Sequence, residues 1–153
     1  MSLAIVVYDV VLFVHVLAVV VAFGVTFTYP IFYAVAARAQ GPQRAAIHRV
    51  QQRIGRTYLS FGLLVVVLAG AYLASDRDLW SEPWVSGPLV IAIVIGGVGG
   101  GFLSPRETRL VDLAGSGPEG EYRKVLGQAR LASYSLSLLV LVAIFLMTTK
   151  PGG

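Results

Sequence analysis

Four long apolar segments constrain the fold of this 153-residue chain more than any other feature. They lie within Leu3 to Ala37 and at Ile54 to Ala74, Val85 to Leu103 and Leu131 to Thr148. A helix of about 20 mostly apolar residues crosses the ~30 Å hydrocarbon core of a bilayer. Only helices and closed barrels satisfy every backbone hydrogen bond there. We therefore expect an all-α protein, a single domain over residues 1–153 that forms a bundle of four transmembrane helices.

The composition agrees with a membrane protein. Hydrophobic residues make up 56% of the chain, charged residues make up 13%, and the mean hydropathy is +0.76. A soluble domain carries about a quarter charged residues. The chain has no cysteine, which excludes disulfides, iron–sulfur clusters and haem attached through cysteine side chains.

The basic residues predict how the bundle is oriented. Two loops, between the first and second segments and between the third and fourth, hold ten of the twelve Lys and Arg residues: Arg38, Arg44, Arg49, Arg53, Arg56, Arg106, Arg109, Arg123, Lys124 and Arg130. Basic loops tend to stay in the cytoplasm. We expect a multi-pass protein of the cell (inner or plasma) membrane with both termini outside, and with Trp80 and Trp84 at the outer interface.

The same loops indicate which partners to expect. The spacing of Arg49, Arg53 and Arg56 predicts a basic stripe that contacts lipid headgroups. The loops lack the interleaved aromatic residues and the binding fold of a nucleic-acid interface. We expect membrane lipids as partners and no nucleic acid, with a homodimer or a partner helix as further alternatives.

Short helices are expected between the spans. Ser104-Pro105-Arg106-Glu107 has the pattern of a capping box with proline at the first helical position, which predicts a new helix that begins at Ser104 and ends near Ala114. A second helix is expected to begin near Glu119 and to continue into the fourth segment. Gly41-Pro42 is expected to end the extension of the first segment.

The glycine run from Ile95 to Gly101, IGGVGGG, has two interpretations. No Lys follows the glycines as a Walker loop requires, and Phe102 stands where a dinucleotide fingerprint needs its last Gly. Close helix packing remains. The Gly-x-x-x-Gly pairs are Gly96 with Gly100 and Gly97 with Gly101, and a second seam at heptad spacing holds Gly55, Gly62 and Ala69. These seams predict packing within the bundle, a homodimer through the third segment, or space for a flat cofactor.

His15 is the one histidine within a predicted span, and a buried ionisable group in a membrane is a functional candidate. The residues that share its helix face are Tyr8, Ala22, Thr26, Tyr29 and Tyr33. That face should point into the bundle, because lipid would leave the imidazole unpaired. His48, in the first basic loop, is expected to be solvated or to face headgroups.

The depth of His15 depends on where the first segment enters the membrane. If the segment enters at Val10, the imidazole lies roughly 8 Å deep, and if it enters at Leu3, roughly 18 Å deep. The deeper register places His15 level with Gly96, Gly97 and Ser137. That arrangement suits either an axial ligand beside space for a planar cofactor or a hydrogen bond from His15 to Ser137.

A family resemblance follows from HVLAVVVAFGVTFTYPIFYAVA, His15 to Ala36. This stretch resembles the first helix of small four-helix membrane proteins that include HemJ-type protoporphyrinogen oxidases and copper-resistance-D-like proteins. The shared features are the histidine near the start of the span and the aromatic-proline pair Tyr29-Pro30. The resemblance implies haem b with His15 as an axial ligand to the iron, the one metal-ligand role expected here.

The resemblance also has departures. Ala22 stands where that branch often has tryptophan, Ile31 stands where it has arginine, and the lysine of its third helix has no counterpart, so the chain is most similar to uncharacterised branches. Two functions are expected. One is a membrane redox or cofactor-binding role centred on His15, Tyr29 and Tyr33. The alternative is a non-enzymatic packing or assembly protein. No catalytic residue can be named, because the second, third and fourth spans hold no acidic residue.

Overall fold

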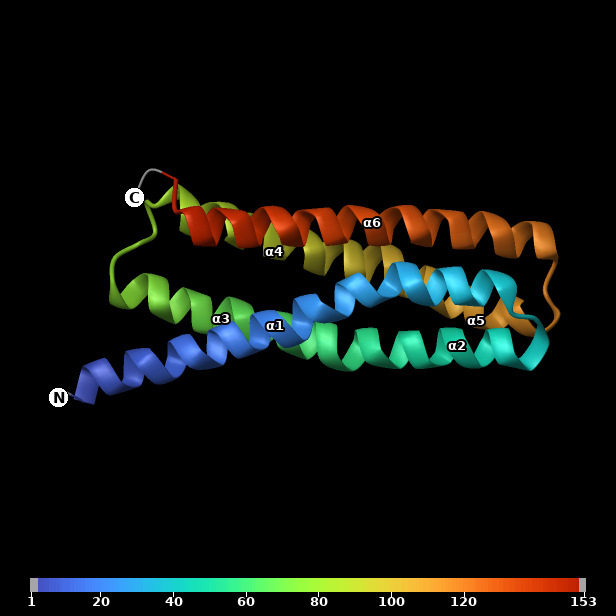
Figure 1. Cartoon of the computed structure of the whole chain (residues 1–153), viewed down its shortest axis with the longest axis horizontal. Helices are drawn as coiled ribbons and strands as arrows, with labels where there is room; N and C mark the ends of the chain where they lie inside the picture. Colours follow the sequence, from blue (N-terminus) through green and yellow to red (C-terminus); the bar gives the residue numbers. More distant parts are fainter. Residues whose placement is uncertain (1–2, 152–153) are drawn as a thin grey trace.

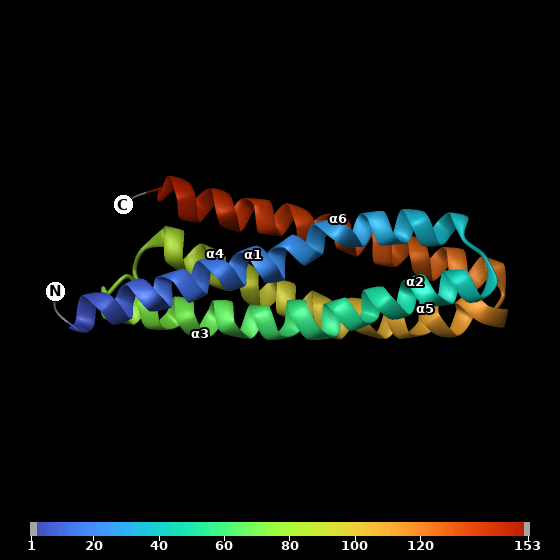
Figure 2. The ribbon, with the colours of Figure 1, turned by 60° about the horizontal axis from the view of Figure 1, so that its bottom comes forward.

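The computed structural model describes residues 3–151, with side chains from residue 6 onward, and every regular element in that range is helical. The α-helices are α1 (Leu3–Arg38), α2 (Gly41–Ile54), α3 (Ser60–Asp76), α4 (Pro83–Gly97), α5 (Ser104–Ser116) and α6 (Glu119–Thr149). Two π-helical turns, η1 (Gly55–Leu59) and η2 (Val98–Leu103), join α2 to α3 and α4 to α5. The elements therefore form four rods that lie side by side (Figures 1 and 2).

All four rods are long and apolar enough to cross a membrane, which confirms the predicted four-helix membrane bundle. Both chain ends lie at one end of the bundle together with the α3–α4 connection, and we call this the terminal end (Figure 1). The α1–α2 and α5–α6 connections lie at the opposite end. We call that the basic end, because the Arg-rich segments are there.

The surface of the rods changes from apolar to polar along the bundle. Large apolar side chains such as Phe13, Phe61, Ile93 and Leu138 are exposed over the part nearer the terminal end, as lipid-facing residues are. The helices α2 and α5, at the basic end, carry most of the charged residues of their rods. All of α5, and all of α2 except its last residue Ile54, therefore lie outside the predicted spans Ile54 to Ala74 and Val85 to Leu103.

Two of the expected helix boundaries are confirmed. Gly41 has a φ of +53°, in the left-handed region that favours glycine, and the chain turns there from α1 into α2. The last rod runs without interruption from Glu119 to Thr149, as predicted.

The α-helix α5 begins at Ser104 and ends at Ser116, as predicted, but the expected capping box is not formed. The third rod continues through η2 into α5, and no side chain caps the backbone at this point. Glu107, which a capping box would turn back toward its own helix start, is 4% exposed and packs instead against Tyr33 of α1. The glycine run allows the wider π turn, a form often found at functional positions in helices.

Pro30 lies inside α1 and explains the position of Ser137. Proline has no N–H, so the carbonyl of Thr26, four residues earlier, loses its helical partner. The Ser137 hydroxyl of α6 lies 3.3 Å from that carbonyl oxygen and shares its hydrogen between it and the Ser133 carbonyl oxygen, 3.0 Å away. A side chain of a neighbouring helix thus satisfies the backbone group that the proline leaves free, as a membrane helix requires.

The glycine seams behave differently from one another. A Cβ at Gly62 would lie 2.7 Å from the Cβ of Ala22, so α1 and α3 approach closely through this glycine. A Cβ at Gly97, Gly100 or Gly101 would meet no atom within 4 Å. Within the described chain, Gly62 therefore allows a close helix contact, whereas Gly97, Gly100 and Gly101 make no such contact and their packing role stays a prediction.

Candidate functional site

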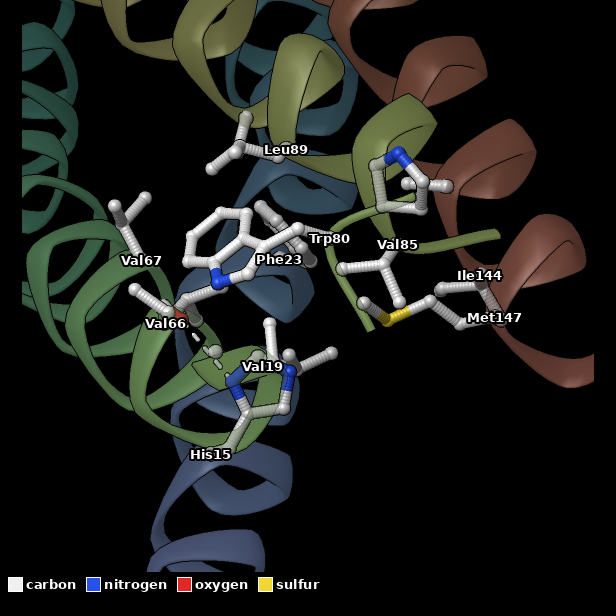
Figure 3. A pocket seen from close by; sticks show the side chains of 16 residues that line it. His15, Val19, Phe23, Val66, Val67, Trp80, Val85, Leu89, Ile144 and Met147 are labelled. Carbon is white, nitrogen blue, oxygen red and sulfur yellow. Dashed lines mark hydrogen bonds between the residues drawn. The ribbon is translucent and has the colours of Figure 1, made fainter. Parts of the chain in front are cut away.

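His15 points into the bundle, as predicted, and is 7% exposed. Its Nδ1 lies 3.0 Å from the carbonyl oxygen of Val66 in α3, and its ring packs against Gly70, where a Cβ would lie 3.1 Å from the imidazole Cε1. Figure 3 shows the imidazole turned toward a small space beside Trp80, Val85 and Met147. We call this space the His15 cavity.

Of the two registers considered for His15, the deeper one does not match the packing around the imidazole. The residues around His15 include Trp80 and Pro88, near the terminal end, rather than Gly96 or Gly97. The Ser137 hydroxyl lies against the Ser133 and Thr26 carbonyl oxygens, so the expected His15–Ser137 hydrogen bond is not formed. The physical reason is that the imidazole packs against Val66 and Gly70 of α3, which fixes its height relative to the other rods.

The His15 cavity limits what can bind there. A histidine whose Nδ1–H is held by a backbone carbonyl keeps Nε2 free as a metal ligand, so His15 itself is suited to ligation. The cavity has a volume of only about 70 Å³, whereas sites for drug-sized ligands and cofactors measure about 300–1,000 Å³. The surroundings of His15 in this structure therefore do not fit a porphyrin.

A larger cavity opens between the second and third rods at the level of the two π turns. It has a volume of about 290 Å³, and we call it the lateral cavity. Apolar walls come from Leu59, Leu63, Ile95 and Leu103, and a polar end comes from Tyr29, Arg56 and Glu107. Exposed apolar residues lie beside it at Tyr58, Phe61 and Phe102. The cavity is thus apolar toward the lipid-facing part of the rods and polar toward the basic end.

Glycines make the space for the lateral cavity. Gly96, Gly99 and Gly100 form part of its wall. On the opposite wall, a Cβ at Gly55 would come closer to the Tyr29 hydroxyl than real Cβ atoms approach other atoms. Tyr29 is 1% exposed, and its hydroxyl forms no hydrogen bond with another described residue. It is therefore a free hydrogen-bond donor at the polar end.

Glu107 is the buried acid of this end. Tyr33 donates a hydrogen bond to its Oε1 at 3.3 Å. Burial raises the pKa of the Glu107 carboxyl to about 7, although the Tyr33 hydrogen bond and the charge of Arg56 oppose this shift. Burial therefore favours the protonated, uncharged form of the Glu107 carboxyl.

The prediction that His48 is solvated is wrong. His48 is 1% exposed, and its Nε2 lies 2.9 Å from the Tyr122 hydroxyl. Burial, and then the neighbouring charge of Arg44, lowers the pKa of the imidazole to about 4, so His48 is neutral at neutral pH. Its Nδ1 has no hydrogen-bond partner, and neither does either amide atom of the buried Gln51.

These side chains form a continuous buried set, which we call the polar row: Glu107, Tyr33, Gln51, His48 and Tyr122. Four different elements supply it, namely α1, α2, α5 and α6. The Gln51 amide lies beside the Tyr33 hydroxyl but outside hydrogen-bond geometry. The ring centroids of Tyr33 and His48 are 6.3 Å apart, so the row has no gap wider than a side chain.

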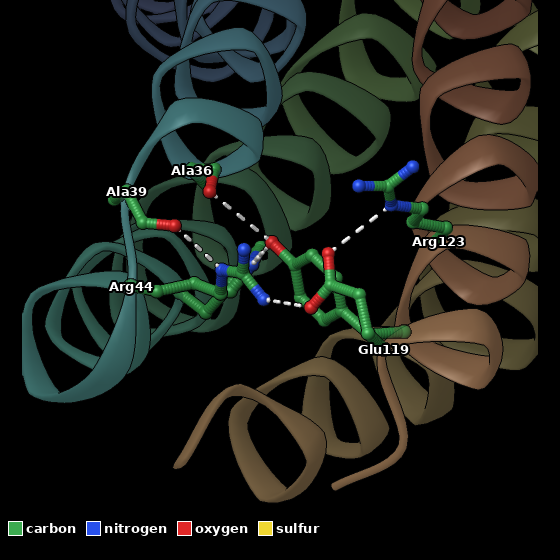
Figure 4. A network of polar contacts seen from close by, with 7 residues as sticks. Ala36, Ala39, Arg44, Glu119 and Arg123 are labelled. Carbon is green, nitrogen blue, oxygen red and sulfur yellow. Dashed lines mark hydrogen bonds and ion pairs between the residues drawn. The ribbon is translucent and has the colours of Figure 1, made fainter. Parts of the chain in front are cut away.

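An ion pair closes the polar row at the basic end. The Arg44 guanidinium lies 4.2 Å from the centroid of the Tyr122 ring, pairs with Glu119 at 2.7 Å and donates to the Ala39 carbonyl. Glu119 also pairs with Arg123 (Figure 4). The Arg44 side chain is largely buried, whereas the Glu119 carboxylate is half-exposed.

Helix periodicity indicates the burial of residues that were not expected in the core. Glu107 lies on the same face as Leu103, Leu110 and Ala114, all of which are buried. Arg44, His48, Gln51 and Gly55 follow one another at spacings of four, three and four, and all four are buried. The polar type of these residues hid the fact that they occupy core positions.

Comparison of the chain with family models, with curated proteins and with solved structures finds no match in any of the three. The resemblance of the first segment to four-helix haem proteins therefore stays a prediction. The function has to be argued from the geometry of the cavities and of the polar row.

Proposed function

We propose that this multi-pass membrane protein binds an amphipathic molecule, taken up from the bilayer, in the lateral cavity. The basic end faces the cytoplasm of the cell membrane in this proposal, as the distribution of Lys and Arg favours. The polar end of the lateral cavity then lies near the inner headgroups, and its apolar walls face acyl chains.

One observation carries the proposal. A cavity of about 290 Å³ joins apolar walls to a polar end that holds a buried carboxyl, a buried tyrosine hydroxyl and a guanidinium. Ligand sites have this composition, because apolar walls supply affinity and a few polar groups fix orientation. An unliganded structural seam between helices would instead be filled by side chains, as protein interiors are close-packed.

The polar groups indicate the chemistry of the ligand. Tyr29 and Arg56 are donors, and Glu107 is also a donor when it is protonated. The head of the ligand therefore accepts hydrogen bonds, as a carboxylate or carbonyl does. The volume matches a small head with the first part of one chain, so we propose a single-chain amphiphile.

The two functions expected from the sequence, haem binding at His15 and assembly through glycines, stay predictions and are less favoured by the geometry than amphiphile binding. Haem at His15 would require the surrounding helices to separate, and an absorbance spectrum of the purified protein from haem-replete cells tests this directly. Assembly through Gly97, Gly100 and Gly101 would use positions where a Cβ would meet no other described part of the chain within 4 Å. A change of oligomeric state in Gly97→Leu would support such assembly.

Thermal unfolding in detergent with oleate as the probe tests the proposed function. A ligand at about 100 times its Kd stabilises the folded state by about 2.7 kcal/mol, so the unfolding temperature of the wild type should rise. Gly100→Leu fills the lateral cavity and should abolish the rise. Gly101→Leu changes the neighbouring glycine, which does not line the cavity, and should respond like the wild type.

Two outcomes would count against binding in the lateral cavity. The first is an oleate response of equal size in all three proteins, which would place the detergent-like probe elsewhere on the surface. The second is no response in the wild type. Octadecene, which has the chain without the head, serves as the control for the polar end and should stabilise the wild type less than oleate.

A further inference from the structure

The polar row lies between two openings of the molecule. One is the lateral cavity, where Tyr29 and Glu107 form the polar end. The other is a groove of about 270 Å³ at the basic end, lined by Tyr122, Glu119, Arg123 and other residues of α6 together with Ala37. We call it the basic-end groove. A side chain of the polar row lines each opening, Glu107 the first and Tyr122 the second.

Every member of the polar row can accept or donate a hydrogen bond. Tyr33 donates to Glu107 at 3.3 Å, and His48 Nε2 lies 2.9 Å from the Tyr122 hydroxyl. Hydroxyl, amide and neutral imidazole groups can each take part in a hydrogen-bonded chain without holding a permanent charge. A hydrogen-bonded pair therefore stands at each end of the polar row, Tyr33 with Glu107 at one end and His48 with Tyr122 at the other.

The middle of the row contains buried polar atoms with no partner. These are Nδ1 of His48 and both amide atoms of Gln51, and each residue is 1% exposed. Buried polar atoms without a protein partner are the usual positions of internal water, which makes about three hydrogen bonds. Water at this point would join Tyr33 to His48 across the 6.3 Å between their ring centroids.

We propose that the polar row is a proton pathway that joins the lateral cavity to the water at the basic end. A proton that leaves the Glu107 carboxyl passes to Tyr33 or to water, and Tyr33, water and His48 each accept one proton and release another, while the Gln51 amide orients the water. His48 accepts at Nδ1 and releases from Nε2 toward Tyr122, whose own hydroxyl proton turns from the Ala36 carbonyl oxygen, 3.4 Å away, to the water of the basic-end groove. One proton reaches that groove, Glu107 is left as a carboxylate, and no other group changes its charge.

The surroundings of Glu107 fit this role. The titratable and charged groups that face it are Tyr29 and Tyr33 from α1 and Arg56 from η1. Burial raises its pKa to about 7, so both charge states are reachable near neutral pH. This inference rests on the proposed function. Through the pathway, the pH of the water at the basic end would set the charge of Glu107 beside the head of the bound amphiphile.

The test follows proton exchange at Glu107 in lipid nanodiscs without added amphiphile. A pH jump is applied, and the carbonyl stretch of the protonated carboxyl is followed by time-resolved infrared spectroscopy. Glu107→Gln assigns the band. Tyr122→Phe and Gln51→Leu should each slow the change by at least about tenfold, because the first removes a proton carrier and the second removes the amide that orients the bridging water.

Tyr134→Phe is the matched control, because Tyr134 is an exposed tyrosine of α6 outside the row, and it should exchange at the wild-type rate. Wild-type rates in both row variants would overturn the pathway and would indicate proton entry beside Arg56. If Tyr122→Phe does not fold, Gln51→Leu decides alone. Slow row variants without any oleate binding would remove the proposed function and leave the pathway in place.

Discussion

Glu107 and His48 are both buried, and burial shifts their pKa values in opposite directions. The pKa of Glu107 rises from 4.5 to about 7. Between these pH values the folded state holds more protons than the unfolded state, so stability falls as the pH rises. The pKa of His48 falls from 6.5 to about 4, so its contribution to stability increases as the pH rises over that range.

The opposition gives a prediction for Glu107→Gln. The two contributions partly cancel in the wild type, and the variant keeps only that of His48. Its unfolding temperature in detergent should therefore rise from pH 4 to pH 6.5 more steeply than that of the wild type. His48→Gln is the matched partner, and its unfolding temperature should fall between pH 4.5 and pH 7. Parallel pH profiles for Glu107→Gln and the wild type would contradict the burial of Glu107.

At the level of single residues, the buried face of α1 could be predicted from the sequence. Thr26, Tyr29 and Tyr33 are buried as expected, because their face is defined by helix periodicity around His15. The positions of His48 and Glu107 were not predictable from residue type. Their burial depends on which faces of α2 and α5 meet α1 and α6, and charge alone suggested the surface.

The contact between α1 and α3 depends on one glycine, and this leads to a prediction at the scale of the helices. Gly62→Ala places a Cβ 2.7 Å from that of Ala22, and overpacking of this kind costs about 1–3 kcal/mol. Gly101→Ala, on the open side of η2, should be neutral or stabilising, because alanine favours a helix by up to about 1 kcal/mol over glycine.

Unfolding of both variants in mixed detergent micelles measures these effects. If Gly62→Ala matched Gly101→Ala in stability, the close approach of α1 and α3 would not exist. The assay needs no functional readout, so it tests the packing independently of any ligand.

Local sequence signals predicted the structure at helix ends only where no tertiary contact competed with them. The turn at Gly41 and the uninterrupted α6 agree with the prediction. The capping box at Ser104 failed, because burial of Glu107 against Tyr33 competes with local capping. The two π turns carry no recognised sequence signature, yet they lie at the level of the lateral cavity.

For the whole molecule, the orientation in the membrane is a prediction that labelling can test. The chain has no cysteine, so single substitutions give clean sites. Ser75→Cys lies at the terminal end and Ser116→Cys at the basic end, and both serines are exposed. In intact cells of a bacterial host, an impermeant maleimide should label Ser75→Cys and spare Ser116→Cys, with the reverse in inverted vesicles. Labelling of Ser116→Cys in intact cells would reverse the orientation.

The number of spans was predictable because length and hydropathy are local properties of the chain. The relative heights of the rods were not. The register of His15 against Gly96 and Ser137 depends on how α1 packs against α3 at Val66 and Gly70, and on the approach of the Ser137 hydroxyl to the Thr26 carbonyl. The lateral cavity arises from the same registers, so it could not be inferred from any single segment.

Photo-crosslinking tests the central claim, amphiphile binding in the lateral cavity, most directly. A fatty acid with a diazirine near its carboxyl end is incubated with the protein in nanodiscs, irradiated, and mapped by mass spectrometry. The account predicts labels concentrated at Leu59, Leu63 and Ile95, and their loss in Gly100→Leu but not in Gly101→Leu. Labels spread evenly over lipid-facing residues such as Phe13 and Leu138, unchanged in Gly100→Leu, would contradict it.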